Sequence, residues 1–234
     1  RVRAEGIKVE PLITEQLAGA GVSDQHVRWA LSVMKSDPAK WNEDELKRFA
    51  VLLRDASKPM IIAANKVDVA PPEFVERLAA LDEIVVPTSA AAEVALRMAD
   101  KSGAIKYRPG DADFELVKDL SGPQKAGLEK IRAILAKMGG TGVQECIDRA
   151  VFELLDYIPV FPVEDEGKWT DRNGVVLPDA YLMKKGSTTK DLAYRIHTDI
   201  GDSFLFALDA RTKMRLGEKH ELKAGDVIKI VSTK

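Results

Sequence analysis

The sequence has very little cysteine: Cys146 is the only one among 234 residues. A single cysteine cannot form a disulfide within the chain, which excludes a disulfide-stapled secreted scaffold and favours a reducing compartment. We therefore predict a cytoplasmic protein. No spacing of cysteine, histidine and acidic residues indicates zinc, so we predict no metal ligands in the chain, and we expect Cys146 to be a small, partly buried side chain.

Long apolar runs and an excess of one charge are also absent. No stretch approaches the roughly 18 apolar residues of a membrane-spanning helix, and the N-terminus has no signal-peptide core. The 35 Lys and Arg residues are balanced by 37 Asp and Glu residues, giving a formal net charge of −2. This balance excludes a chain-wide basic surface, and we expect neither a membrane nor DNA as a partner.

The patterns along the chain predict three segments of different character. Residues 1–57 have helical periodicity and capping signals, such as Asn42 followed by Glu45. Residues 58–157 alternate short apolar runs with helical patterns, which is typical of a parallel α/β sheet. Residues 158–234 contain strand patterns around one helix, which indicates an α+β fold. The predicted fold class is therefore α/β followed by α+β.

The second segment carries more specific patterns. Residues 59–64 form a continuous apolar run, which is typical of a parallel strand covered on both faces. We expect a helix with Val94 and Met98 after the second run, and an irregular segment at residues 104–120.

The last segment carries one expected helix and one local excess of charge. The helix is expected to run from Thr188 to Gly201, with His197 near its C-terminal end, where the helix dipole favours a histidine. From Arg211 to Lys234 there are seven Lys or Arg residues against three acids. The candidate RNA contacts in this stretch are Arg211, Lys213, Arg215 and Lys219. Acidic residues at 164–166 and 171 offset the excess within the same segment.

The tetrapeptide at residues 65–68, Asn-Lys-Val-Asp, follows the first apolar run, and ligands of open parallel sheets bind beyond the carboxyl ends of their strands. The Asp68 carboxylate can accept hydrogen bonds from both the ring N1–H and the exocyclic amine of guanine. Adenine does not present these two donors, so such a site rejects adenine strongly. Asn65 can reach the other edge of the purine, and the Lys66 stem can lie along its face.

A second polar motif, Ser89-Ala90, follows the next apolar run, where a backbone N–H can bond the guanine O6. The alternative is simple turn chemistry, because Asn and Asp favour turns and caps. The pairing of two motifs at successive strand ends makes that alternative the weaker one. The predicted guanine site comprises Asn65, Lys66, Asp68, Ser89 and Ala90.

The two motifs resemble the base-recognition motifs of translation-factor-type P-loop GTPases. The tail resembles a TGS domain, a ubiquitin-like β-grasp module that also occurs in threonyl-tRNA synthetases and stringent-response enzymes. The residues that carry this second resemblance are 177–181, 185–188, 191–194, 196–199 and 225–228. A GTPase core followed by a TGS domain resembles the Obg-related YchF family, and its archaeal branch most closely. Residues 1–57 are compatible with the helical insertion of that family.

The resemblance implies a GTP-binding and GTP-hydrolysing switch protein near the ribosome, with GTP and Mg²⁺ as cofactors. The sequence contains no G-x-x-x-x-G-K-[ST], the motif that holds the phosphates and places a hydroxyl on Mg²⁺. Three D-x-x-G matches, at Asp100, Asp119 and Asp171, follow the base motif, whereas the family places its γ-phosphate sensor before it. We therefore expect the catalytic half upstream of Arg1, no catalytic residues in this chain, and no GTP hydrolysis by it alone.

Two alternatives stay open. YchF proteins of bacteria and eukaryotes commonly carry an Asn-x-x-Glu form that accepts ATP, whereas Asp68 favours GTP. A nucleotide-independent module in which the tail binds RNA or the ribosome is the other alternative.

Overall fold

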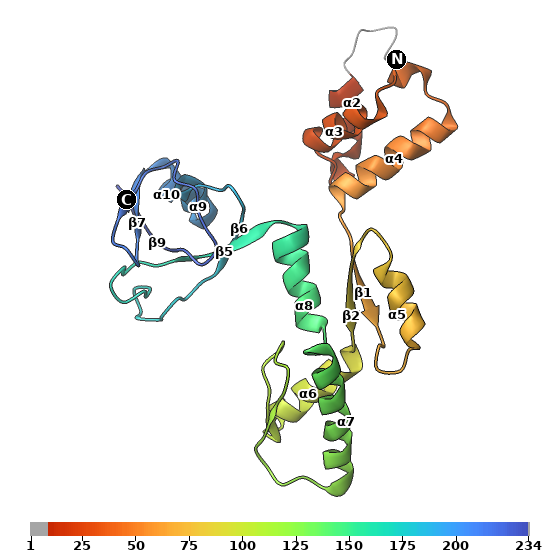
Figure 1. Ribbon diagram of the computed structural model, residues 1–234. Coiled ribbons are helices and arrows are strands. Elements are labelled where there is room, and N and C mark those ends of the chain that lie inside the picture. The colour runs from red at the N-terminus through yellow and green to blue at the C-terminus, as the bar shows by residue number, and fades with distance from the viewer. Residues whose placement is uncertain (1–8, 234) are drawn as a thin grey trace. The chain divides into compact units, whose positions relative to one another are not determined.

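The computed structural model describes residues 9–233 of the chain, which divides into two compact units, Arg1–Cys146 and Ile147–Lys234 (Figure 1). The predicted boundaries near residues 57 and 157 stay a prediction. Within the described part of the chain, no helix is both long and apolar enough to cross a membrane.

The first unit begins with helices, as the sequence predicts, although residues 1–8 of the predicted segment lie outside the described residues. The elements are α2 (Val9–Leu17), α3 (Asp24–Met34) and α4 (Glu43–Ser57), with short 3-10 turns at Ala18–Ala20 and Pro38–Lys40. Their shared core consists of Val22, Val27, Ala30, Met34, Phe49 and Leu53. The capping box predicted at the start of α4 is confirmed, because Asn42 and Glu45 exchange hydrogen bonds of 2.9 Å in both directions.

Two parallel strands follow, β1 (Ile61–Asn65) and β2 (Ile84–Thr88), joined by α5 (Pro72–Ala79). Their register pairs Asn65 with Thr88, so both carboxyl ends lie at one edge of the sheet (Figure 1). The parallel pairing is confirmed, but the expected burial of β1 on both faces is wrong. Ala64 is the one buried residue of this strand, because β2 is its sole strand neighbour among the described residues.

The rest of this unit comprises α6 (Ala90–Lys101), β3 (Ile105–Lys106), β4 (Glu115–Leu116) and α7 (Gly122–Met138). The helix expected with Val94 and Met98 is confirmed as α6, but these two residues are 56% and 69% exposed, and the helix buries Ala92, Glu93 and Leu96 instead. Residues 104–120 are also less irregular than expected, since β3 and β4 pair in an antiparallel ladder. Ladders of two residues are too short to leave a period-2 pattern in the sequence.

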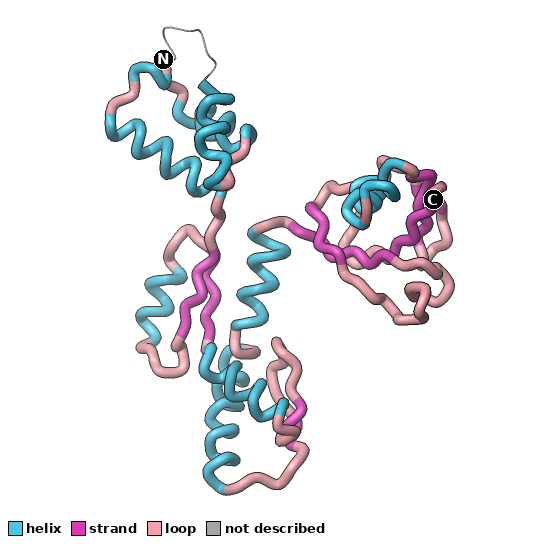
Figure 2. Tube along the Cα trace, turned by 180° about the vertical axis from the view of Figure 1, so that it is seen from behind, coloured by secondary structure: helices cyan, strands magenta, loops and turns pink. Residues whose placement is uncertain are grey.

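The second unit is a mixed sheet of five strands in the order β6-β5-β9-β7-β8, with β5 parallel to β9 and the other pairs antiparallel. Its longer strands are the magenta segments in the C-terminal part of the chain in Figure 2. Helix α8 (Val143–Asp148), which begins in the first unit, and a π-helical turn (Arg149–Leu154) precede it. The strands are β5 (Tyr157–Pro162), β6 (Tyr181–Lys184), β7 (Phe204–Asp209), β8 (Arg215–Leu216) and β9 (Val227–Ser232). Leu192 of α9 (Thr189–Ile196) packs into the core of this sheet. The predicted β-grasp fold is confirmed.

His197 divides the predicted 188–201 helix in two. Helix α9 ends at Ile196, His197 is extended with φ −161°, and α10 (Thr198–Asp202) begins after it. The Nδ1 atom of His197 accepts the N–H of Asp199 at 3.2 Å. The expectation of one continuous helix is wrong because this ring nitrogen caps the start of α10. His197 therefore satisfies a free backbone donor, in addition to lying at the C-terminus of α9.

Candidate nucleotide-binding site

The loops that leave β1 and β2 are joined directly. Val67 donates its N–H to the Thr88 carbonyl oxygen at 3.3 Å, just beyond the last paired residues of the two strands. The two predicted motifs therefore lie together at the carboxyl edge of the parallel pair, which is where ligands of such sheets bind.

Asn65 connects the two loops through its side chain. Its Oδ1 accepts the N–H of Lys66 at 2.8 Å and the N–H of Ala90 at 3.1 Å. With the carbonyl oxygen engaged in this way, the Nδ2 amide is the group left to donate, and a purine N7 is an acceptor. The Ala90 N–H, a candidate donor to the guanine O6, is paired with Asn65, so a bound guanine has to share or displace this hydrogen bond.

Ser89 orients the carboxylate of Asp68. The hydroxyl of Ser89 donates to Oδ1 of Asp68 at 2.9 Å, and it accepts the N–H of Ala92 at 3.4 Å as the N-cap of α6. Ser89 is fully buried whereas Asp68 is exposed. A buried, doubly bonded hydroxyl thus fixes one carboxylate oxygen, while the carboxylate faces solvent and is available to a ligand with two adjacent donors.

The backbone of Lys66 is in the left-handed region, with φ 73°. This conformation costs a non-glycine residue about 1–2 kcal/mol. It is held by the N–H groups of Val69 and Ala70, which both donate to the Lys66 carbonyl oxygen, at 3.1 and 2.9 Å. Strained residues of this kind cluster at ligand sites, and the exposed Lys66 belongs to the first of the two recognition loops.

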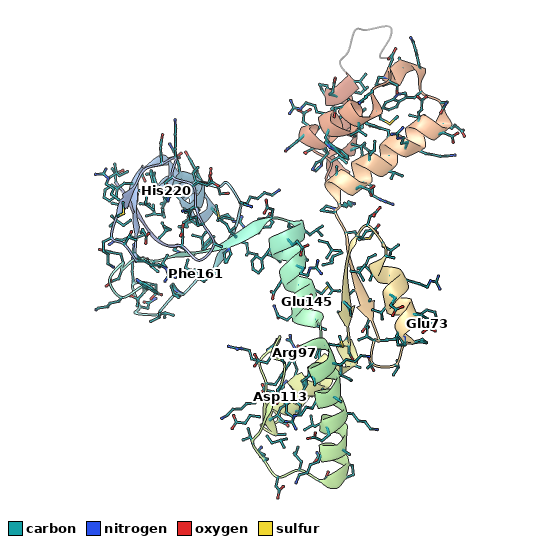
Figure 3. The ribbon with its side chains drawn as sticks, in the orientation of Figure 1. Glu73, Arg97, Asp113, Glu145, Phe161 and His220 are labelled. Carbon is teal, nitrogen blue, oxygen red and sulfur yellow. The ribbon has the colours of Figure 1, made fainter. Side chains whose placement is uncertain are left out.

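Sequence reasoning missed a buried polar cluster behind Ser89. The N–H of Ser89 donates to the Thr141 carbonyl oxygen at 2.9 Å, and the Thr141 hydroxyl donates to Oε2 of Glu93 at 2.6 Å. The same Glu93 oxygen accepts from the Tyr107 hydroxyl at 2.8 Å, and Oε1 accepts from Nε of Arg97 at 2.5 Å, a side chain that Figure 3 labels.

Electrostatics agree with a charged carboxylate in this cluster. Burial acts to raise the pKa of Glu93, but the hydrogen bonds from Thr141, Arg97 and Tyr107 together hold that pKa below its ordinary value. Burial, with the hydrogen bond to Glu93, raises the pKa of Tyr107 to about 12. Tyr107 is therefore the proton donor in this contact and Glu93 the acceptor over the whole physiological pH range.

The sequence carries a signal for this cluster in the run Gly139-Gly140-Thr141-Gly142, where three glycines flank one polar residue. Gly142 has φ 76°, and a Cβ there would lie 1.9 Å from the Pro87 carbonyl oxygen. A glycine is required because the chain both turns and touches the end of β2 at this point.

The four candidate RNA contacts lie on the second unit and are exposed, but three of them have partners within the unit. The Arg211 guanidinium lies 4.8 Å from the centre of the Trp169 ring, and that of Arg215 lies 3.9 Å from the Phe206 ring. Lys213 donates to the Glu166 carbonyl oxygen. The hydrogen bond from Lys190 lowers the pKa of Glu218, and the charge of Lys219, the fourth candidate, adds to this effect.

The acids that offset this stretch are also engaged. Glu166 pairs with Lys229 at 2.6 Å, and Glu164 pairs with Arg172 at 2.5 Å. The Glu164–Arg172 pair is exposed and contributes about 0–1 kcal/mol to stability, whereas the Glu166–Lys229 pair is half-buried. Both pairs neutralise charge of the acidic loop beside the basic stretch.

Comparison with known proteins identifies two families along the chain. Residues 63–165 match the family described as "Obg-like GTPase YGR210-like, G4 motif-containing domain", and residues 173–232 match the TGS domain. The uncharacterized GTP-binding protein MJ1332 of Methanocaldococcus jannaschii is 48% identical over 225 residues, which are 94% of this chain and 57% of that protein. The uncharacterized GTP-binding protein C428.15 of Schizosaccharomyces pombe is 29% identical over 170 residues, or 67% of this chain and 41% of that protein.

A solved structure agrees with these matches. The crystal structure of a GTP binding protein from Pyrococcus horikoshii OT3 is similar to this chain with a TM-score of 0.78 and 45% identity, over 100% of this chain and 63% of that one. The chain thus spans less than two thirds of the length of these relatives. The predicted family is confirmed: the chain belongs to the Obg-like GTPases and carries their G4-motif domain followed by a TGS domain.

Proposed function

We propose that this chain recognises the guanine base of GTP within a GTP-hydrolysing switch protein that acts with the ribosome in the cytoplasm. The observation that carries the proposal is the joining of the Asp68 and Ala90 loops at one edge of the sheet, through Ser89 and Asn65. Because the chain spans only part of its relatives, hydrolysis and ribosome association are proposals for the longer protein.

The phosphates and Mg²⁺ of GTP would be held by residues outside this chain. The sequence has no phosphate-loop motif, and the described residues include no group of three or more His, Cys, Asp or Glu side chains placed to hold a metal. Phosphoryl transfer depends on both, so the 234-residue chain is expected to contribute base selectivity and no hydrolysis of its own.

Base selectivity can be measured on the chain itself. We expect millimolar GMP to shift the backbone amide signals of residues 65–70 and 88–92 in ¹H–¹⁵N spectra, and AMP to leave them unchanged, because adenine lacks the two donors that Asp68 accepts. Equal shifts with both nucleotides, or none with either, would contradict guanine recognition.

The second unit is proposed to contact ribosomal RNA or tRNA through Arg211, Lys213, Arg215 and Lys219. We expect tRNA binding by the full chain to weaken with salt, and Lys219→Ala to reduce the slope of log K against log[salt] by about 1, the value for one phosphate contact. Lys47, an exposed lysine of α4, provides the control, since Lys47→Ala removes the same charge from the other unit. A tRNA affinity that does not depend on salt concentration, or an equal change of slope in both variants, would contradict this assignment.

A further inference from the structure

The Ser89–Ala90 backbone can recognise guanine only if its position is fixed, and hydrogen bonds from a buried cluster fix it. We infer that Glu93 and Thr141 are positioning residues for base recognition, acting through the backbone of Ser89. The inference rests on the proposed guanine site and adds two residues that do not touch the base.

Burying the Glu93 carboxylate costs desolvation free energy, so a role in fold stability alone does not explain it. It lies in the first turn of α6, is 4% exposed, and receives hydrogen bonds from Thr141, Tyr107 and Arg97. A buried charge stabilises a fold little, because its desolvation offsets most of what its partners contribute. Buried ionic groups can instead fix one conformation, and this carboxylate fixes a loop 48 residues away in sequence.

The connection to the site is a continuous series of hydrogen bonds. Glu93 Oε2 accepts from the Thr141 hydroxyl at 2.6 Å, the Thr141 carbonyl accepts from the Ser89 N–H at 2.9 Å, and the Ser89 hydroxyl donates to Asp68 at 2.9 Å. Thr141 is 1% exposed, so no bulk water is available to replace a lost partner. Releasing Thr141 from Glu93 therefore loosens both the Ser89 backbone and the orientation of the Asp68 carboxylate.

Thr141→Val tests this series by removing the hydroxyl while keeping the shape of the side chain. We expect GMP affinity of the chain to fall about tenfold, the equivalent of one hydrogen bond at the upper end of its usual worth. The amide signals of Ser89 and Ala90 should move in the absence of nucleotide. Thr141→Ser restores the hydroxyl and is expected to bind GMP like the wild type, which a role limited to methyl packing does not predict.

A matched control comes from the other unit. Thr189 is 0% exposed and its hydroxyl donates to the Gly217 carbonyl oxygen at 2.7 Å, so Thr189→Val removes a comparable buried hydrogen bond. We expect this variant to lose stability and to keep its GMP affinity. If Thr141→Val does not fold, Glu93→Gln replaces it, because the amide keeps one acceptor while the charge is lost, and we expect about a threefold weaker GMP affinity.

The outcomes separate the two proposals. A folded Thr141→Val or Glu93→Gln that binds GMP as tightly as the wild type overturns the positioning role and leaves guanine recognition intact. A Thr141→Ser variant as weak as Thr141→Val also overturns it. A wild-type chain that does not prefer GMP to AMP overturns the proposed function itself.

Discussion

Replacing Asp68 by asparagine is expected to reverse the base preference of the site from guanine to xanthine. The Asp68 carboxylate is exposed and is oriented by Ser89, so it can accept from two adjacent donors. Asparagine keeps one acceptor and presents an amide donor where guanine has its own amine, whereas xanthine has a carbonyl there. Losing two charge-assisted hydrogen bonds costs about 3–4 kcal/mol, which corresponds to a roughly 10²- to 10³-fold weaker affinity for guanine.

The reversal can be followed with GMP and XMP on the same chain. In Asp68→Asn, the amide shifts of residues 65–70 and 88–92 should disappear with GMP and appear with XMP. Asp82, an exposed acid before β2, provides the control, because Asp82→Asn changes the net charge equally and lies outside both loops. Amide shifts with GMP that persist in Asp68→Asn would show that the Asp68 carboxylate does not recognise the base.

The meeting of the two motifs at one edge of the sheet was predictable, because each motif is short and lies next to a strong local signal. The apolar runs before Asn65 and Ser89 predict strands, and parallel strands bring their carboxyl ends to one edge. What the sequence could not specify is that Asn65 occupies the Ala90 N–H, because a bond between residues 25 apart depends on the register of β1 and β2.

The support behind the site was not predictable for the same reason. Val94 and Met98 are four residues apart, which is typical of a buried helix face, yet α6 turns the adjacent face inward because Glu93 finds three donors there. Periodicity records which residues are apolar and carries no information on where a charged side chain finds distant partners. Charge counting likewise carries no information on packing partners, such as the Trp169 ring that lies beside the Arg211 guanidinium.

Gly142→Ala is expected to be the most destabilising single substitution considered for this loop. The new Cβ would meet the Pro87 carbonyl oxygen at 1.9 Å and the Thr88 Cα at 3.2 Å, both backbone atoms of β2 that cannot rotate away. The left-handed backbone and the overlap together cost about 3 kcal/mol or more. The loop must then move, and Ser89 loses the Thr141 carbonyl oxygen that accepts its N–H.

Gly139 separates the two causes of that destabilisation. Its φ of 77° nearly equals the 76° of Gly142, but a Cβ there meets nothing within 4 Å. Gly139→Ala should therefore cost only the backbone strain, about 1 kcal/mol, and leave the Ser89 amide protected. In native-state hydrogen exchange, Ser89 should exchange about 10²-fold faster in Gly142→Ala and less than tenfold faster in Gly139→Ala. Equal acceleration in the two variants would mean that backbone strain alone, and not the overlap with β2, causes the loss of protection at Ser89.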